Sequence, residues 1–257
     1  MTFREYAIVL QTFFDRDVMR IFRIWRQILL PPAISSLLYF LIFGTLIGSR
    51  VGDIGGMPYI SFIIPGLMLM NMIMSSFTNS IFLVYTAKFQ RSIEELLVSP
   101  VPSWLIIVGL VMGSVVRSLI VGVIILIIAM FFAHITIAHV SILIYFAVMT
   151  TVLFSLFGIM NGLYAKSFDD LSTVSTFVLT PLTYLGGVFF SASMLPGIFG
   201  KLVYINPIFY MINGFRYGFY GTGDTFPTMS IIVLFFITAA VLFLTHRLFI
   251  KGFGMRA

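Results

Sequence analysis

Residues 104–133 read WLIIVGLVMGSVVRSLIVGVIILIIAMFFA, an apolar run whose one charged residue is Arg117. As a helix this run would be about 45 Å long, more than the roughly 30 Å of hydrocarbon in a bilayer. Similar runs lie at about 28–48, 60–86, 140–165, 173–191 and 228–250. The sequence therefore predicts an all-α membrane protein with six transmembrane helices.

The composition agrees with a membrane protein. Hydrophobic residues make up 60% of the chain and charged residues 9%, whereas a soluble domain carries about 25% charged residues. The chain contains no cysteine, which excludes disulfides and thiolate metal sites. The net charge of +6 does not indicate a nucleic-acid partner, because the basic residues lie at the ends of apolar runs.

Lysine and arginine predict the orientation of the helices. After an even number of crossings both termini lie on one side, and that side collects most of the basic residues: Arg4, Arg16, Arg20, Arg23, Arg26, Lys88, Arg91, Lys166, Arg247, Lys251 and Arg256. The other side holds Arg50, Lys201 and Arg216. The positive-inside rule therefore places both termini in the cytoplasm.

Residues 1–27 predict an amphipathic helix. At 100° per residue its apolar face carries Phe14, Val18, Ile21, Phe22 and Trp25, and its opposite face carries Arg16, Arg20, Arg23 and Gln27. A tryptophan and arginines on opposite faces are typical of a helix lying in the membrane interface. The alternative is an ordinary juxtamembrane helix that only satisfies the positive-inside rule. The transmembrane domain then covers 28–257.

Two polar segments interrupt the runs. In 88–103, Ser92 and Glu95 match a capping box, and Pro100 and Pro102 would end a short helix. This segment predicts either a docking element for a soluble motor or a plain connecting loop. The segment 192–222 is too rich in glycine and proline to span, so we interpret it as a re-entrant or interfacial hairpin on the external side.

Catalytic machinery is absent from the sequence. The stretch 197–201 lacks the spacing of a phosphate-binding loop, and His134, His139 and His246 lack metal-ligand partners, so we expect neither a metal nor a cofactor on this chain. No run has an Asp or Glu well inside it, although ion-coupled carriers commonly need one. An external energy source is favoured; an ion-coupled secondary carrier and a membrane-embedded lipid-modifying enzyme remain the alternatives.

Arg117 has three interpretations. A central arginine costs about 2.5–3.5 kcal/mol on insertion scales. We favour a side chain that snorkels to the cytoplasmic interface. The second interpretation is a structural contact with backbone carbonyls or with an asparagine, and the third is contact with a substrate.

Other residues within the runs predict packing. The pairs Gly109/Gly113 and Gly158/Gly162 favour close approach of helices within the chain over a dimer seam. We expect Asn71, Asn79 and Asn161 to face the bundle interior and to hydrogen-bond a neighbour, with a role in translocation as the alternative. Aromatic residues crowd the last third of the chain; an interfacial belt explains many of them, and the others could line a path for an amphipathic cargo.

Several motifs together resemble the ABC-2-type exporter permeases. They are TFVLTPLTYLGGVFF at 176–190, MLP at 194–196, Asn206-Pro207, Phe215-Arg216 and KFQRSIEELLVSPVP at 88–102. The similarity runs over essentially the whole chain. One departure is Ser191, which stands where many relatives have proline.

The resemblance implies a homodimer in the bacterial inner membrane, bound to two copies of a cytoplasmic ATP-binding subunit that holds ATP and magnesium. It implies coupling through Arg91, Glu94, Glu95 and Leu96, with Arg20 and Arg23 beside them and 166–170 as an accessory contact. It also implies that 192–222 gates the outer end. The candidate path or gate residues are Asn71, Tyr184, Phe189, Phe190, Tyr210 and Arg216. Lipid-like molecules, glycans and drugs are the substrate classes.

Overall fold

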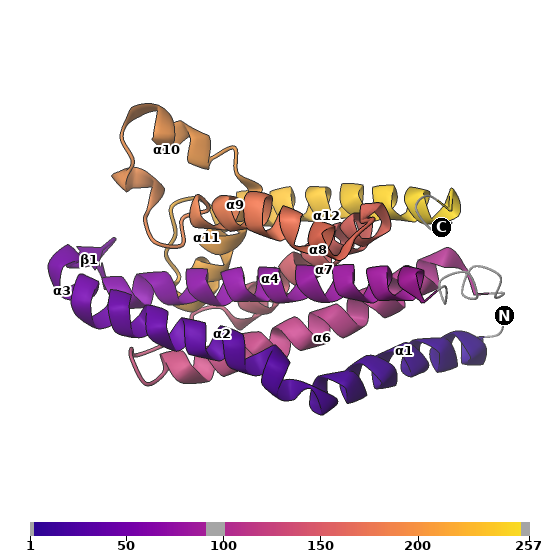
Figure 1. Cartoon of the computed structure of the whole chain (residues 1–257). Helices are drawn as coiled ribbons and strands as arrows, with labels where there is room; N and C mark the ends of the chain where they lie inside the picture. Colours follow the sequence, from indigo (N-terminus) through magenta and orange to yellow (C-terminus); the bar gives the residue numbers. More distant parts are fainter. Residues whose placement is uncertain (1–2, 91–100, 253–257) are drawn as a thin grey trace.

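The computed structural model describes residues 3–90 and 101–252, and most of them lie in long helices packed side by side (Figure 1). Five helical segments in this part of the chain are long and apolar enough to cross a membrane: Trp25–Gly44, Tyr59–Phe89, Ser103–Ala129, Val140–Tyr164 and Pro227–Ile250. Each matches one of the predicted runs within a few residues. Helix α4 (Tyr59–Phe89) is the most buried of them and lies at the centre of the bundle.

The N-terminal amphipathic segment is divided between two helices. Helix α1 (Phe3–Arg23) ends where Ile24 leaves the helical region at φ −120° and ψ 30°, and α2 (Trp25–Tyr39) starts directly after it. The break between the two helices falls at Ile24, three residues before the predicted boundary at residue 27. The first predicted crossing continues through the π-helix η1 (Phe40–Ile47) and α3 (Gly48–Val51). A short hairpin follows, β1 (Asp53–Ile54) with β2 (Met57–Pro58).

Close packing against α4 fixes the core. Helix α7 (Val140–Tyr164) packs against α4 at two glycines. An added Cβ at Gly158 would lie 2.5 Å from the carbonyl oxygen of Phe77, and one at Gly162 would lie 2.9 Å from the side chain of Val84. Helices α6 (Ser103–Ala129) and α12 (Pro227–Ile250) complete the bundle. The predicted role of Gly158 and Gly162 in intrachain packing is confirmed.

The fifth predicted run, 173–191, is shorter and less regular than the other spans. It consists of α8 (Phe168–Val174), the π-helix η2 (Ser175–Leu179) and α9 (Thr180–Tyr184), and it begins with a capping box of Ser167 and Asp170. After α9 the chain turns at Gly187, which has φ 82°. The α8–α9 segment is too short to count among the five spans above, so the sixth crossing stays a prediction.

The predicted re-entrant segment holds the 3-10 turn η3 (Ala192–Met194), α10 (Gly197–Val203) and α11 (Pro207–Tyr220). The Asn206-Pro207 motif begins α11, because the Asn206 side chain caps the N–H of Ile208 and Pro207 occupies the first turn. Gly221 ends it in the left-handed conformation. Helix α11 is largely buried against α7 and α12, whereas α10 projects from the bundle (Figure 1).

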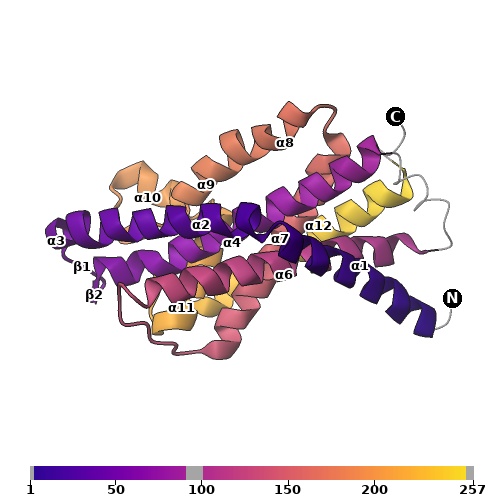
Figure 2. The same cartoon turned by 60° about the horizontal axis from the view of Figure 1, so that its bottom comes forward.

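Both ends of the chain lie at one end of the bundle. The start of α1 and the end of α12 are on the same side, with the ends of α4 and α6 that flank 91–100 (Figures 1 and 2). The hairpin of β1 and β2 and helix α10 lie at the opposite end (Figure 2). This arrangement agrees with termini on one face of the membrane; which face is cytoplasmic stays a prediction.

Candidate transport path and coupling region

The predicted coupling residues fall into two groups. Arg91, Glu94, Glu95 and Leu96 lie outside the described residues. Arg20 and Arg23 both lie on α1, but only Arg23 is exposed. Arg20 is half-buried, with its guanidinium 5.2 Å from the ring centre of Phe82 on α4. Arg20 therefore contacts the bundle, which the helical wheel of the sequence does not indicate.

Helix α1 is seated on α6 through one buried face. Phe13, Asp17 and Ile21 form this face, and Phe13 and Asp17 lie directly over Gly109 and Gly113 of α6. An added Cβ at Gly109 would lie 2.7 Å from the Phe13 ring. The two glycines thus form a groove for α1, which confirms that they serve intrachain packing.

Asp17 is an acid buried in this contact, with 3% of its surface exposed. Its Oδ1 accepts a 3.1 Å hydrogen bond from Arg16 Nε, and its Oδ2 has no hydrogen-bond partner among the described residues. Burial raises the pKa of Asp17 above its ordinary value, and the nearby Arg16 offsets part of this rise. Burial likewise lowers the pKa of Arg20, and Asp17 opposes that shift. Asp17 and Arg20 line a small cleft with Asn79 of α4.

Arg117 does not snorkel. Its Nη1 donates a 2.8 Å hydrogen bond to Oδ1 of Asn79, and the Nδ2 of Asn79 donates to Ser114 Oγ at 2.9 Å. The favoured interpretation of Arg117 is therefore wrong, and the second one, a tie to an asparagine, is confirmed. Hydrogen bonding within the bundle is available because Asn79 on α4 and Arg117 on α6 face each other.

Two of the predicted path residues meet in an aromatic cluster that also includes side chains from α2 and η1. We define this aromatic cluster as Tyr39, Phe43, Tyr184 and Phe189. Ring centres lie 5.0 Å apart for Phe43 and Phe189 and 5.7 Å apart for Tyr184 and Phe189. The hydroxyls of Tyr39 and Tyr184 are 3.3 Å apart, which joins α2 to α9. Each member keeps part of its surface exposed.

Asn71 lies on α4 and faces α2. Its Nδ2 donates to the carbonyl of Leu67 at 2.9 Å and to Ser36 Oγ of α2 at 3.3 Å, and the residue is half-buried. The expectation that it hydrogen-bonds a neighbouring helix is confirmed. Tyr39 and Phe43 were not predicted as path residues, because the sequence does not say which face of the first run meets the fifth.

The remaining predicted path residues lie elsewhere. Phe190 and Tyr210 pack in a separate small cluster around Phe209, and Tyr210 donates to the carbonyl of Tyr204 at 3.0 Å. Arg216 is 2% exposed. Its Nη2 donates to the carbonyl of Gly187 at 2.8 Å, and its guanidinium lies 3.7 Å from a ring centre on α4. The structure does not bring these three side chains into the aromatic cluster.

Arg216 and Ser191 instead lie beside the β1–β2 hairpin, at the end of the bundle opposite the termini. Ser191 Oγ donates a 2.6 Å hydrogen bond to Asp224, and Asp224 also accepts from the N–H of Ala192 at 3.3 Å. The Oδ1 of Asn213 in turn accepts the N–H of Asp224 at 2.6 Å. Ser191 therefore ties the start of η3 to the loop after α11 through its hydroxyl.

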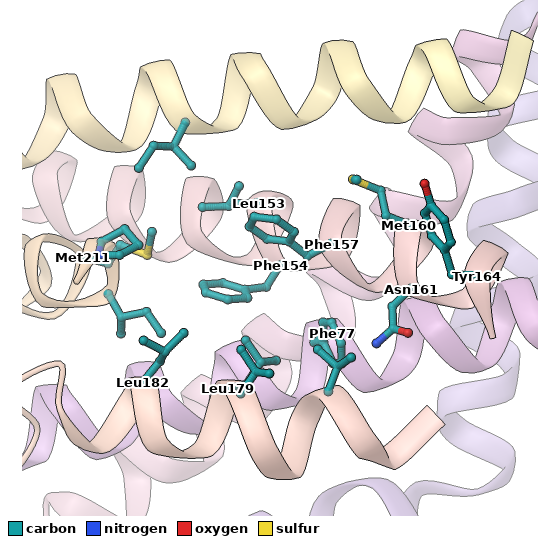
Figure 3. Close-up of a pocket in the computed structure, with 15 residues that line it drawn as sticks. Phe77, Leu153, Phe154, Phe157, Met160, Asn161, Tyr164, Leu179, Leu182 and Met211 are labelled. Carbon is teal, nitrogen blue, oxygen red and sulfur yellow. The ribbon is translucent and has the colours of Figure 1, made fainter. Parts of the chain in front are cut away.

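An apolar pocket of about 480 Å³ lies on α7, between the α8–α9 segment and α12 (Figure 3). Its lining comes from several elements: Phe77, Leu153, Phe154, Phe157, Met160, Asn161, Tyr164, Val174, Val178, Leu179, Leu182, Pro207, Ile208, Met211 and Ile237. No member of the aromatic cluster lines it. Asn161 Nδ2 is buried without a hydrogen-bond partner in the described part of the chain, so the expected bond to a neighbouring helix is not made.

The family of the chain follows from comparison with known proteins. The model of the ABC-2 type transporter family matches residues 8–220. The chain belongs to this family. The match covers the whole bundle through α11 and confirms the resemblance that the motifs at 88–102 and 176–190 indicate.

Two relatives illustrate the range of similarity. The inner membrane transport permease YadH of Escherichia coli K12 is 46% identical over 254 residues, which cover 98% of each chain. Nodulation protein J of Sinorhizobium fredii is 23% identical over 199 residues, which cover 75% of each chain. As an ABC-2 family member with five apolar spans, the chain is a membrane transport protein.

Proposed function

We propose that this chain is the membrane-spanning permease of an ATP-driven exporter in a bacterial inner membrane. The family match over 8–220 carries the proposal, because ABC-2 permeases generally pair with an ATP-binding subunit. The name of YadH, an inner membrane transport permease, supports the location. The cargo is an amphipathic molecule, such as a lipid-like compound, a glycan or a drug.

Energy enters from two copies of an ATP-binding subunit at the end of the bundle that holds both termini. Contact is made through the segment 88–103, where Arg91, Glu94, Glu95 and Leu96 are the proposed docking residues. Arg23 is exposed and stays a proposed second contact, although it lies at the α1–α2 kink and not at the start of α1. Arg20 serves differently: it packs on Phe82 and passes movement of α1 to α4.

The docking step is tested by co-purification of this chain with the ATP-binding subunit. Reversal of charge at Glu94 and Glu95 is expected to reduce recovery of the complex, while the helical content of the permease is unchanged. Full recovery and full ATP-dependent transport by the reversed variant would contradict the docking proposal. Substrate movement in vesicles without any ATPase would favour an ion-coupled carrier, and covalent change of a lipid would favour an enzyme.

The path runs along the face that carries the aromatic cluster, with a second copy of the chain opposite. Tyr39, Phe43, Tyr184 and Phe189 keep exposed surface there, and Asn71 adds a polar group that bonds to Ser36, on the same helix as Tyr39. Aromatic faces contact amphipathic molecules without requiring an ion pair. Loss of the ring in Tyr184→Ala is expected to lower transport, and Phe236→Ala, at an exposed position on α12, is the matched control. Equal transport by both variants would exclude this face.

A further inference from the structure

The apolar pocket on α7 has a lining that suits a hydrocarbon chain. Its walls are mainly leucine, phenylalanine, methionine, valine and isoleucine side chains, and its volume of about 480 Å³ is within the range of about 300–1,000 Å³ typical of ligand sites. An apolar cavity of this kind does not hold ordered water, because water needs polar partners. An apolar ligand is the matching occupant.

Two polar side chains, Asn161 and Tyr164, line the pocket, and the amide of Asn161 indicates where the ligand carries an acceptor. Figure 3 shows Asn161 extending from α7 toward the α8–α9 segment, beside Phe77. The Nδ2 of Asn161 is buried and donates to no atom of the described residues. Since a buried N–H without a partner is destabilising, a bound carbonyl oxygen at this point would stabilise the site.

The position of the pocket determines the source of the ligand. It lies between the apolar spans α7 and α12, so the surrounding solvent is the bilayer. Three of its lining side chains also reach the outer surface of the bundle: Phe157 is 36% exposed, Tyr164 53% and Val178 47%. A chain from the membrane can therefore enter between the α8–α9 segment and α12. Part of the wall is the π-helix η2, and π-helical segments recur at functional sites.

We propose that this pocket binds one acyl chain of a membrane glycerolipid, with the ester carbonyl accepting a hydrogen bond from Asn161 Nδ2. The site is separate from the path of the proposed function, since it shares no residue with the aromatic cluster. The bound chain fills the space on α7 and supports the irregular α8–α9 segment from inside the bundle.

The test uses the full chain in vesicles that contain a photoactivatable phosphatidylglycerol, with a diazirine on one acyl chain. Crosslinked residues are mapped by mass spectrometry. We expect crosslinks at pocket residues such as Leu153, Leu179 and Met211 above those at exposed positions of α6. An even distribution over the outer surface would mean ordinary boundary lipid and would overturn the proposal. No ATP or partner is needed, so this result is independent of the transport proposal.

The ester contact is tested with a second probe in which an ether replaces the ester of the labelled chain. The ester probe is expected to crosslink about two- to tenfold more than the ether probe, the range that one hydrogen bond contributes. Asn161→Leu should abolish this preference, because it removes the donor and keeps a similar side-chain volume. A preference that survives Asn161→Leu, or no preference in the unmodified chain, would overturn the role of Asn161.

Two tryptophan variants distinguish a loss of crosslinks caused by filling the pocket from a loss caused by a general effect of the substitution on the protein. Leu179→Trp places a large side chain in the wall and is expected to suppress pocket crosslinks. Ile127→Trp adds the same side chain at an exposed position of α6 and should leave them unchanged. Equal loss in both variants would contradict a specific site. Where Leu179→Trp reduces the yield of folded protein, the probe comparison with Asn161→Leu still decides the outcome.

Discussion

The close packing of α1 on α6 predicts a specific effect of Gly113→Ala. An added Cβ at this position would lie 2.6 Å from Cγ and 2.7 Å from Cβ of Asp17. Because these atoms are close to the backbone of α1, a side-chain rotation cannot relieve the overlap, and the helix must move. Overpacking of this kind costs about 1–3 kcal/mol. The expected result is weaker attachment of α1.

Gly122→Ala on the same helix is the matched control. Its Cβ would meet Met72 Sδ at 2.8 Å, near the end of a flexible side chain that can shift. Both substitutions replace glycine by alanine inside α6, so the gain in helix propensity of about 0.8–1 kcal/mol is common to both. The difference between them isolates the contact with α1.

Attachment of α1 can be measured by cysteine labelling, because the chain contains no cysteine of its own. Ile21→Cys places a thiol in the α1–α6 contact, where Ile21 is 5% exposed. When opening and closing are fast, the rate of modification by a water-soluble maleimide follows the population of the open form. A cost of 1–3 kcal/mol predicts a rate about 5- to 150-fold higher in Gly113→Ala than in Gly122→Ala. Equal rates would refute the reasoning.

Three further predictions concern stability. Gly158→Ala should lower the unfolding temperature in detergent, because the added Cβ meets a backbone carbonyl of α4 and overpacking costs about 1–3 kcal/mol. An unchanged unfolding temperature would mean that α4 and α7 are not in close contact. Arg216→Leu removes donors from two buried carbonyls, each worth about 1–3 kcal/mol when left unpaired, and thermal unfolding that matches the unmodified chain would contradict this role. The backbone N–H groups of Lys166 and Ser167 hold the pKa of Asp170 below its ordinary value of 3.8. The Asp170 carboxylate therefore stabilises the start of α8 fully above pH 3.8, and this stabilisation is lost as the pH falls through the lowered pKa. Asp170→Asn should reproduce the loss at neutral pH as faster hydrogen exchange at the start of α8, and equal protection would exclude the cap.

The apolar spans are predictable from sequence, because hydrocarbon imposes a minimum length on each helix. The run at 60–86 corresponds to α4 (Tyr59–Phe89), for example, and 228–250 to α12 (Pro227–Ile250). The run at 173–191 is harder to predict, because its helix ends at Tyr184 and the chain turns at Gly187, and hydropathy does not register the backbone geometry.

Side-chain partners are less predictable than spans. Asp17 sits in the polar pattern of an amphipathic helix, so nothing in its neighbours along the chain indicates burial at 3% exposure. The hydrogen bond between Arg117 and Asn79 could be predicted only from the rotation of α4 and of α6 about their own axes, which the sequence does not give. Tyr39 joins Tyr184 across 145 positions of sequence, a contact that periodicity cannot reveal.

The glycine contact between α4 and α7 limits how this protein can change shape. Gly158 meets the carbonyl oxygen of Phe77, and Lys88 Nζ fastens the end of α4 to the carbonyls of Leu163 and Ala165 at 3.1 and 3.0 Å. Sliding of one helix along the other would break both contacts, so the pair must move as one body. The two π-helices, η1 and η2, lie outside this pair, on the helices that meet through Tyr39 and Tyr184. We expect any movement of these helices relative to α4 and α7 to bend the chain at η1 and η2, because π-helical turns interrupt the regular hydrogen bonding of a helix.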